Sequence, residues 1–220
     1  MKSIISLDNV EYSVSTGGMI SADRGKKEIL KNISFSLDKG SILGIAGESG
    51  CGKTTLAKLI AGIIKPTGGT IEYAGDLKQP KSKAATVQIL FQNNGEILNP
   101  LREIEETVEE ALLIAHNDFE NIEAEKNIVF DSVGFLEVLR RKKGYQLSGG
   151  EQQRAALARL LAVKPEVLIL DEPFSAQDPD SQYNLLNLLK KINKDLGITL
   201  ICIAHNLQML NKLCNNVIIM

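Results

Sequence analysis

Cysteine is scarce in this sequence, and the few cysteines present are not spaced as metal ligands. Of the 220 residues only three are cysteines, Cys51, Cys202 and Cys214, an odd number with no CxxC pair and no neighbouring histidine. Disulfide-rich proteins use even numbers of cysteines, and zinc sites use closely spaced pairs. We therefore expect neither a disulfide framework nor a zinc site.

Long apolar runs are also absent. A membrane-spanning helix needs about 18 or more consecutive apolar residues, whereas the longest candidates here, such as Ile198 to Ala204, have the length of a strand. The N-terminus offers one early lysine and a short Ile4–Ile5 run before Asp8, which lacks the apolar centre of a signal peptide. These features predict a chain that stays in the cytosol and does not cross a membrane.

The chain has no excess of charge of either sign. Its 25 Lys and Arg residues nearly balance its 27 Asp and Glu residues, which leaves a formal net charge of −2. No bulk positive field is therefore available to hold nucleic acid or an anionic bilayer. With 44% apolar and 24% charged residues the composition is that of a globular protein. The length suits one large domain, or one domain with an inserted subdomain.

The N-terminal part shows the alternation of apolar and polar residues that is typical of half-buried strands. Residues 3–14 and 33–37 have this period, and Asp38 to Gly40 turns the second strand into a third, Ser41 to Ala46. Residues 15–27 contain glycines among small or charged residues and have no apolar period. This segment predicts a flexible surface loop.

Strands and helices then alternate along the chain. A helical pattern begins at Gly52, carries Ile63 on its apolar face and stops at Pro66. Further strands are predicted at 70–73, 86–91, 167–170, 198–204 and 217–220, and further helices at 148–163 and 179–196. Strands separated by helices of this length predict a parallel sheet with right-handed crossovers.

Residues 98–145 break this alternation with one helix after another. Asn99 and Pro100 open the first helix, whose apolar face includes Ile104 and Val108. Five glutamates elsewhere in this helix are most simply explained as a solvated face. The stretch is then a helical insertion into an α/β core.

The strongest motif is a phosphate-binding loop. Gly47 to Thr54 reads GESGCGKT, which fits GxxxxGK[ST], and it lies between an apolar strand and a helix as that motif requires. Glycines let consecutive backbone N–H groups turn toward phosphate oxygens, while Lys53 adds a positive charge and Thr54 a ligand for Mg²⁺. A glycine-rich turn with a solvated lysine is the alternative without a ligand. The complete fit favours a nucleoside triphosphate with magnesium.

Two carboxylates end the apolar strand at 167–170. Asp171 and Glu172 follow it directly, and ligands of open α/β sheets bind at the carboxyl ends of the strands. Asp171 would hold Mg²⁺ through its water, and Glu172 would orient or deprotonate the water that attacks the γ-phosphate. Alone, the pair could be a strand end that meets solvent. Beside a phosphate loop, the functional interpretation is favoured.

A helix begins with a hydroxyl and two glycines at Ser148. In the segment LSGGEQQR, the free N–H groups could bind an anion, or Ser148 could cap the helix together with Glu151. This segment resembles the signature motif of the ATP-binding cassette (ABC) family, whose other motifs occur in order along nearly all of the chain. The resemblance implies one ATP-binding domain over residues 1–220. It would have an α/β P-loop NTPase core of the RecA-like type, an N-terminal antiparallel β subdomain and a helical subdomain inserted at about 98–145.

Further residues take their roles from this resemblance. Tyr12 would stack on adenine, Gln92 would touch Mg²⁺, and His205 would contact the γ-phosphate. Without the family they are a strand aromatic, a loop glutamine and a histidine at a strand end. The segment from Ser175 to Asp178 would be the loop that crosses a dimer interface, where Gln177 replaces the usual leucine. Asp178 could equally cap the following helix.

Motif and resemblance together define the predicted site. Its catalytic residues are Glu172, His205 and Gln92, and its metal-binding residues are Thr54, Gln92 and Asp171. Its nucleotide-binding residues are Tyr12, Gly47, Glu48, Ser49, Gly50, Cys51, Gly52, Lys53, Thr54, Thr55, Ser148, Gly149, Gly150 and Asp178.

The resemblance also implies an activity and partners. Proteins of this family bind two ATP molecules between two cassettes arranged head to tail, which makes Ser148 and Gly150 contacts to the partner's nucleotide. The expected activity is ATP hydrolysis that drives solute transport. The expected partners are a second cassette, in a homodimer or heterodimer, and membrane-spanning subunits on separate chains. The cassette would lie at the cytoplasmic face of the cell membrane.

Two readings of the biological role remain. GESGCGKTTL and the Leu98 to Pro100 segment are similar to the branch of the family that imports oligopeptides, dipeptides and nickel. The alternative is a soluble ABC ATPase that works on nucleic acid or ribosomes. Such proteins usually carry two cassettes, zinc modules or long coiled coils, which this sequence does not show, and no nucleic acid partner is expected.

Overall fold

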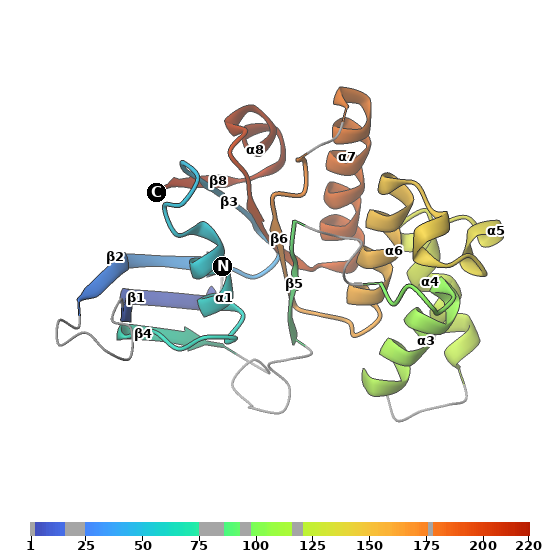
Figure 1. Ribbon diagram of the computed structural model, residues 1–220, viewed down its shortest axis with the longest axis horizontal. Coiled ribbons are helices and arrows are strands. Elements are labelled where there is room, and N and C mark those ends of the chain that lie inside the picture. The colour runs from blue at the N-terminus through green and yellow to red at the C-terminus, as the bar shows by residue number, and fades with distance from the viewer. Residues whose placement is uncertain (1–2, 16–24, 75–85, 93–97, 116–120, 176–177) are drawn as a thin grey trace.

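The computed structural model describes residues 3–15, 25–74, 86–92, 98–115, 121–175 and 178–220. They form an antiparallel sheet, a parallel sheet and a group of helices, with the parallel sheet between the other two (Figure 1). This arrangement confirms the predicted α/β core with an N-terminal antiparallel subdomain. Within the described part of the chain, no helix combines the length and apolar character needed to cross a membrane.

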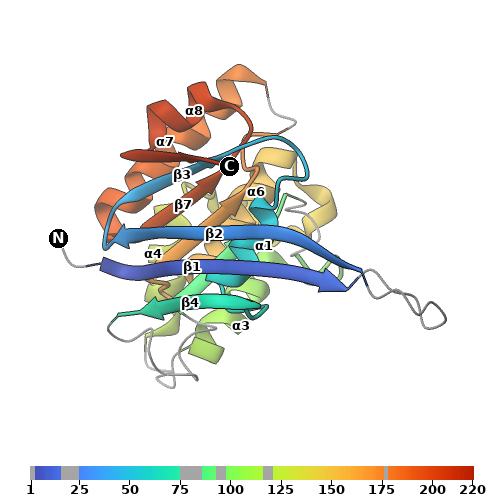
Figure 2. The ribbon, with the colours of Figure 1, turned by 90° about the vertical axis from the view of Figure 1, so that its left-hand side faces the viewer.

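The antiparallel sheet has the strand order β2-β1-β4. It consists of β1 (Ser3–Ser15), β2 (Lys26–Asp38) and β4 (Gly68–Tyr73). Leu7 of β1 stands opposite Phe35 of β2 on one side and Ile71 of β4 on the other. Figure 2 shows these strands crossing in front of the parallel sheet.

Both ends of the predicted loop at residues 15–27 belong to strands in the structure. Ser15 belongs to β1 and pairs with Lys26, and Lys27 pairs with Val14. These strand ends are exposed, so they need no alternation of apolar and polar residues. Backbone pairing therefore extends the hairpin beyond the part that the sequence pattern indicates. Residues 16–24 lie outside the described part of the chain.

The parallel sheet has the strand order β5-β6-β7-β3-β8. Every pair of neighbours in it is parallel, as predicted. Its strands are β3 (Ile42–Ala46), β5 (Val87–Leu90), β6 (Val167–Asp171), β7 (Thr199–Ile203) and β8 (Asn216–Ile219).

Both faces of the parallel sheet are covered. Leu168 and Leu170 of β6 enter one apolar cluster with the helices of the C-terminal half. Val167 and Ile169 enter a second cluster, which contains α1 and the inner side of the antiparallel sheet. A strand buried on both faces reads as a continuous apolar run, which is why β6 was visible in the sequence.

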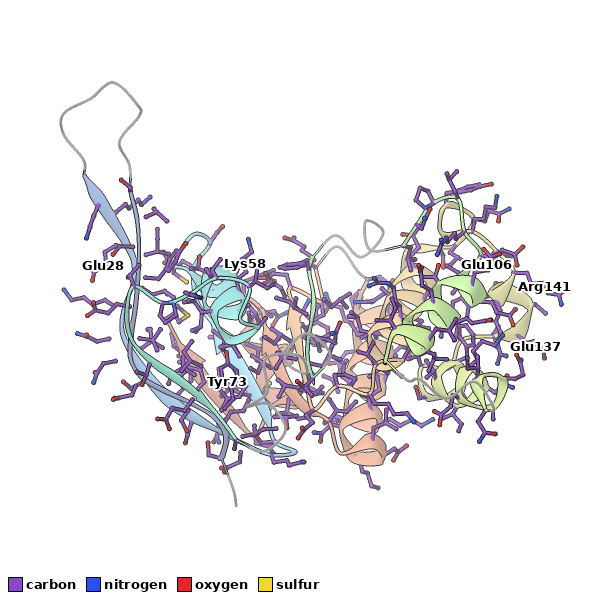
Figure 3. The ribbon with its side chains drawn as sticks, turned by 90° about the horizontal axis from the view of Figure 1, so that it is seen from below. Glu28, Lys58, Tyr73, Glu106, Glu137 and Arg141 are labelled. Atoms are coloured by element: carbon purple, nitrogen blue, oxygen red, sulfur yellow. The ribbon has the colours of Figure 1, made fainter. Side chains whose placement is uncertain are left out.

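Helices fill the space around the sheets. In the described residues they are α1 (Lys53–Ile60), α3 (Ile104–Ala115), α4 (Ile122–Ser132), α5 (Glu137–Arg140), the short 3-10 helix η3 (Gly144–Gln146), α6 (Gly149–Leu161), α7 (Pro179–Leu196) and α8 (Leu207–Leu213). Helix α3 packs against α4 and α6. Tyr73 is the last residue of β4 and reaches α1 (Figure 3), where its hydroxyl donates to the carbonyl of Ile60 over 2.9 Å.

Two helix boundaries differ from the sequence prediction. Helix α1 ends at Ile60, not at Pro66, because Gly62 adopts a left-handed conformation with φ of 73°. Ile63 lies beyond that end and is 55% exposed. Helix α3 begins at Ile104, because the Asn99 side chain accepts a hydrogen bond from the Leu101 N–H over 2.9 Å and forms a turn instead.

The glutamates of α3 are not all solvated. Glu105 and Glu109 accept hydrogen bonds from Lys126 of α4 over 3.0 and 2.9 Å, and Glu123 lies 2.7 Å from the same ammonium. The Lys126 side chain is only 6% exposed. Burial opposes its charge, but the hydrogen bonds to these glutamates outweigh burial and raise the pKa of Lys126. Glu106 is exposed, as a solvated face predicts (Figure 3), whereas Glu105 and Glu109, 27% and 42% exposed, are partly covered and share the buried Lys126.

Candidate active site

The predicted phosphate loop connects β3 to α1, where its glycines have the backbone conformations that the motif requires. Gly50 and Gly52 have φ of 85° and 103°, in the left-handed region that favours glycine. A Cβ atom at Gly52 would lie 2.8 Å from the Leu30 side chain and 3.2 Å from the Ile29 carbonyl oxygen. Strand β2 thus covers the loop closely, and only glycine fits at this position.

Lys53 is held inside the loop. Its ammonium donates to the carbonyl oxygens of Gly47 and Glu48 over 2.9 and 2.8 Å. The residue is 8% exposed, which excludes the solvated lysine of the alternative interpretation. Its charge lies where the loop curves around a potential anion.

Thr54 and Asp171 meet across the site. The Thr54 hydroxyl donates to the Asp171 carboxylate over 2.6 Å, which joins the start of α1 to the end of β6. Burial and, less strongly, the nearby charge of Glu172 raise the pKa of Asp171. The hydrogen bond from Thr54 lowers this pKa, but its effect is smaller than that of burial. The ionised carboxylate is therefore destabilised in this position unless a cation approaches it.

Glu172 occupies an unusual backbone conformation. Its φ is 52°, although it is not glycine, and such a conformation costs energy of the order of 1 kcal/mol or more. Its N–H donates to the carbonyl of Ile203 over 2.8 Å, and its carbonyl accepts from the Ser175 hydroxyl over 2.8 Å. These bonds hold the turn that directs the Glu172 side chain away from the strand.

The Glu172 carboxylate contacts His205. The carboxylate oxygen and the His205 Nδ1 lie 2.9 Å apart. The Glu172 side chain is 17% exposed and the imidazole 71% exposed. The histidine at the end of β7 therefore reaches the predicted base from the solvent side.

These groups share one hollow of about 480 Å³. Its described lining consists of Ile29, Ser49, Gly50, Gly52, Lys53, Thr54, Thr55, Gln92, Asp171, Glu172, Ser175 and His205. The hollow includes the three predicted catalytic residues and the three predicted metal-binding residues. Of the phosphate loop, Gly47, Glu48 and Cys51 lie outside the lining.

Two lining residues were missed by the sequence analysis as site residues. Ile29 belongs to the part of β2 that had no assigned element, and nothing in its local pattern indicates a contact with the phosphate loop. Ser175 was noted only as part of an interface loop, although a hydroxyl three residues after Glu172 is a signal for a turn.

Ser148, Gly149 and Gly150 do not line this hollow. They are exposed at the start of α6. Ser148 and Glu151 form the capping box considered in the sequence analysis, with bonds of 3.4 and 2.8 Å. Capping does not exclude anion binding, because Gly149 and Gly150 still present N–H groups to solvent.

Neither Tyr12 nor Asp178 is among the residues that line the hollow. Tyr12 is half-buried in β1, opposite Leu30 of β2. Asp178 caps α7 by accepting hydrogen bonds from the Ser181 N–H and hydroxyl over 3.0 and 2.6 Å. The neighbouring Gln177 lies outside the described residues.

The hollow has few possible metal ligands of its own. No group of three or more His, Cys, Asp or Glu side chains capable of holding a metal occurs in the described residues. Oxygen atoms of Thr54, Asp171 and Gln92 are present instead. Mg²⁺ prefers this kind of ligand set, in which one or two protein oxygens are completed by substrate phosphates and water.

A parallel sheet with a phosphate loop at its carboxyl edge and an acidic strand end beside it defines the P-loop NTPase class. Comparison with known proteins narrows the class. A family model described as ABC transporter matches residues 30–175, and the chain belongs to this family.

Curated relatives are named as ATP-binding proteins of transport or import systems. The oligopeptide transport ATP-binding protein OppF of Haemophilus influenzae is 36% identical over 199 residues, which cover 87% of this chain and 60% of that protein. The dipeptide transport ATP-binding protein DppF of Escherichia coli K12 is 35% identical, with 92% and 63% coverage. The nickel import ATP-binding protein NikE of Escherichia coli is 32% identical, with 99% and 83% coverage. The chain thus spans about three fifths of the length of the first two relatives.

Solved structures share the fold. The cbiO1 protein of Clostridium perfringens, part of the transporter complex cbiONQ, superimposes with a TM-score of 0.86 at 28% identity and covers 100% of this chain and 85% of its own. The ATP-binding cassette MJ0796, in a dimeric post-hydrolysis state with ADP and Pi, gives 0.81 at 27% identity, with 99% and 94% coverage. Both neighbours are cassettes of the ABC type.

Proposed function

We propose that this chain is the ATP-hydrolysing subunit of an ABC transporter and that ATP-driven pairing with a second cassette powers its transport. One observation carries the proposal: a single hollow brings together the phosphate loop, the Thr54–Asp171 pair and the Glu172–His205 pair. Each pair has the chemistry that hydrolysis of a nucleoside triphosphate requires.

Binding would rest on the phosphate loop. The Lys53 ammonium now donates to the carbonyl oxygens of Gly47 and Glu48. Phosphate oxygens are stronger acceptors for an ammonium than neutral carbonyl groups. The lysine therefore already lies in place to compensate the charge of ATP. Tyr12, on β1 of the antiparallel sheet, is the proposed contact for adenine.

The residues present fit a magnesium ion. The Thr54 hydroxyl and the Asp171 carboxylate lie together in the hollow, and Gln92 lines it as well. Burial raises the pKa of Asp171, and a cation would offset that destabilisation of its charge. Bound by these oxygens, Mg²⁺ would neutralise charge on the β- and γ-phosphates.

Glu172 is the proposed general base. Its carboxylate is placed in the hollow by the strained turn after β6, and would accept a proton from the attacking water. His205, 2.9 Å from that carboxylate, would fix its orientation and face the γ-phosphate. Gln92, two residues after β5, lines the hollow and is the proposed contact for Mg²⁺.

A second cassette would complete the site. Ser148, Gly149 and Gly150 are exposed and do not line the hollow of their own chain. In the proposed head-to-tail pair they face the partner's nucleotide, and Asp178 lies at the interface between the cassettes. The dimeric state of the neighbour MJ0796 supports this arrangement.

The proposed transport is import of a peptide or of nickel. The curated relatives OppF, DppF and NikE are named for these activities. Membrane-spanning subunits on separate chains would hold the cassette at the cytoplasmic face of the membrane. The comparisons do not support the alternative, an ATPase that works on nucleic acid or ribosomes, and the net charge of −2 gives it no electrostatic basis.

The direct test is release of phosphate from Mg-ATP by the purified chain, with Lys53→Ala as its control. We expect the wild-type chain to hydrolyse ATP, and the control to lose affinity for ATP because Lys53 is the charged group of the loop. A wild-type chain that binds no ATP, or a control with unchanged affinity, would contradict the proposal.

A further inference from the structure

Gln153 is a buried polar residue near the start of α6, just before the helix becomes apolar. It is 2% exposed, and the following residues Ala155 to Ala158 are completely buried. A buried amide is costly unless it forms hydrogen bonds. The Gln153 Nε2 donates to the carbonyl oxygen of Pro173 over 3.0 Å. The amide is therefore directed at the loop that follows β6.

That loop begins with the proposed base. Pro173 follows Glu172, whose φ of 52° is not a conformation that the residue would adopt without support. The support comes from several elements: Gln153 of α6 holds Pro173, Gln182 of α7 donates to the Phe174 carbonyl over 3.0 Å, and Ser175 holds Glu172 itself. The direction of the Glu172 carboxylate thus depends on the position of α6.

The same helix begins at Ser148. The capping box with Glu151 makes the first turn well defined, and Gln153 lies in the turn that follows it. A helix of 13 residues moves as one body. A shift of its exposed start therefore shifts the amide that holds Pro173.

We propose that Gln153 is a positioning residue that couples the start of α6 to Glu172. The proposal rests on the proposed function, in which the start of α6 meets the nucleotide of a second cassette. Contact of Ser148 with that nucleotide would fix the position of α6. Through its hydrogen bond to Pro173, Gln153 would then fix the position of Glu172 in the chain's own site. Hydrolysis at one site then depends on occupancy of the other.

The variant Gln153→Met tests the coupling, because the change keeps the length of the side chain and removes its hydrogen-bond donor. The matched control is Gln152→Met, since Gln152 donates to the carbonyl oxygens of Gly144 and Leu147 on the other side of the helix start. Two measurements are made on the full chain: hydrogen exchange of the amides in residues 172–175, and the kcat and KM for Mg-ATP.

We expect Gln153→Met to speed exchange at residues 172–175 about 2- to 10-fold, as loss of one hydrogen bond implies. The kcat should fall about 10-fold or more through misplacement of the base, while the KM for ATP stays near the wild-type value. Gln152→Met should leave exchange at residues 172–175 unchanged.

Three results would overturn the proposal. Unchanged exchange in Gln153→Met would show that the amide does not hold the loop. Faster exchange with unchanged kcat would show a bond without a role in positioning the base. A rise in KM equal to the fall in kcat would indicate damage to the nucleotide site. A wild-type chain without ATPase activity would instead overturn the proposed function, so the two failures are distinguishable.

Discussion

At the scale of single residues, the site depends on carboxylates held in different ways. Asp171 is buried at a strand end and its pKa is raised by burial first and by Glu172 second. Glu172 lies one residue further on, in a strained turn, and contacts His205. In the proposed function, this difference in surroundings would let adjacent carboxylates serve a cation and a water molecule separately.

Replacement of Glu172 by Gln should leave binding of ATP intact and slow its hydrolysis by about 10²-fold or more, because the amide cannot accept the proton of water. Lys53, Thr54 and Asp171 are untouched by the change. Steady-state phosphate release measures the rate, and equilibrium binding of labelled ATP measures the affinity. Turnover near the wild-type rate would contradict the role of Glu172 as base.

The cysteines provide a second test at this scale. Burial raises the pKa of Cys202 well above its ordinary value and that of Cys214 to about 12, and the thiolate is the nucleophile. Cys51 is only half-buried, inside the phosphate loop. Brief maleimide treatment near pH 7 should therefore label Cys51 ahead of the others, and Mg-ATP should slow that labelling by covering the loop. Peptide mass mapping identifies the labelled residue. Equal labelling of Cys51 with and without Mg-ATP would show that the nucleotide binds elsewhere.

At the scale of elements, the sequence predicted what a local pattern can encode. The strands β3, β6 and β7 were visible as apolar runs, and α7 as a capped amphipathic helix. The end of α1 was not, because the left-handed conformation of Gly62 ends the helix before the apolar period does. The residues of the hollow could be predicted where a motif contains them, at Lys53, Asp171 and Glu172.

Contacts between distant elements could not be predicted. The glutamates of α3 have helical spacing, but the sequence does not show that Lys126 of α4 packs against them. The role of Ile29 above the phosphate loop depends in the same way on how β2 crosses α1. The bond from Gln153 to Pro173 joins residues 20 positions apart, because α6 lies beside the loop that follows β6.

Lys126→Met should destabilise the helices α3 and α4 by about 1–3 kcal/mol. Removal of one partner from a buried ion pair typically costs about 3–5 kcal/mol, and this figure is reduced here because Glu109 and Glu123 are 42% and 71% exposed. The pKa of Lys126 is raised, so its stabilisation is complete below the ordinary value of 10.5 and is lost only as the pH rises through the higher folded value. The decrease in the free energy of unfolding caused by Lys126→Met should therefore be constant between pH 6 and pH 9.

Denaturant unfolding measures this difference, and Lys164→Met is the matched control. Lys164 pairs with Glu125 over 2.9 Å but is 54% exposed, so its removal should cost less than about 1 kcal/mol. Equal decreases in the free energy of unfolding in the two variants would contradict the assignment of Lys126 as the buried connection between α3 and α4.

At the scale of the whole molecule, the proposed function divides each ATP site between two separate surfaces of the chain. The hollow contains the groups proposed for phosphate binding and for proton transfer. The start of α6, with Ser148 exposed, lies outside that hollow. In two chains placed head to tail, the hollow of one chain would face the start of α6 of the other, and ATP would link the two surfaces. A change in the mass of the assembly is the direct consequence.

The most direct measurement is the mass of the Glu172→Gln chain in solution, by light scattering after size exclusion, with Mg-ATP, with Mg-ADP and without nucleotide. We expect a dimer with Mg-ATP and a monomer in the other conditions, because the γ-phosphate completes the contact with Ser148 and slow hydrolysis preserves it. Adding Ser148→Arg should return the chain to a monomer with Mg-ATP while its ATP affinity stays unchanged. A monomer under every condition, or a dimer whose formation ignores both nucleotide and Ser148→Arg, would contradict the account.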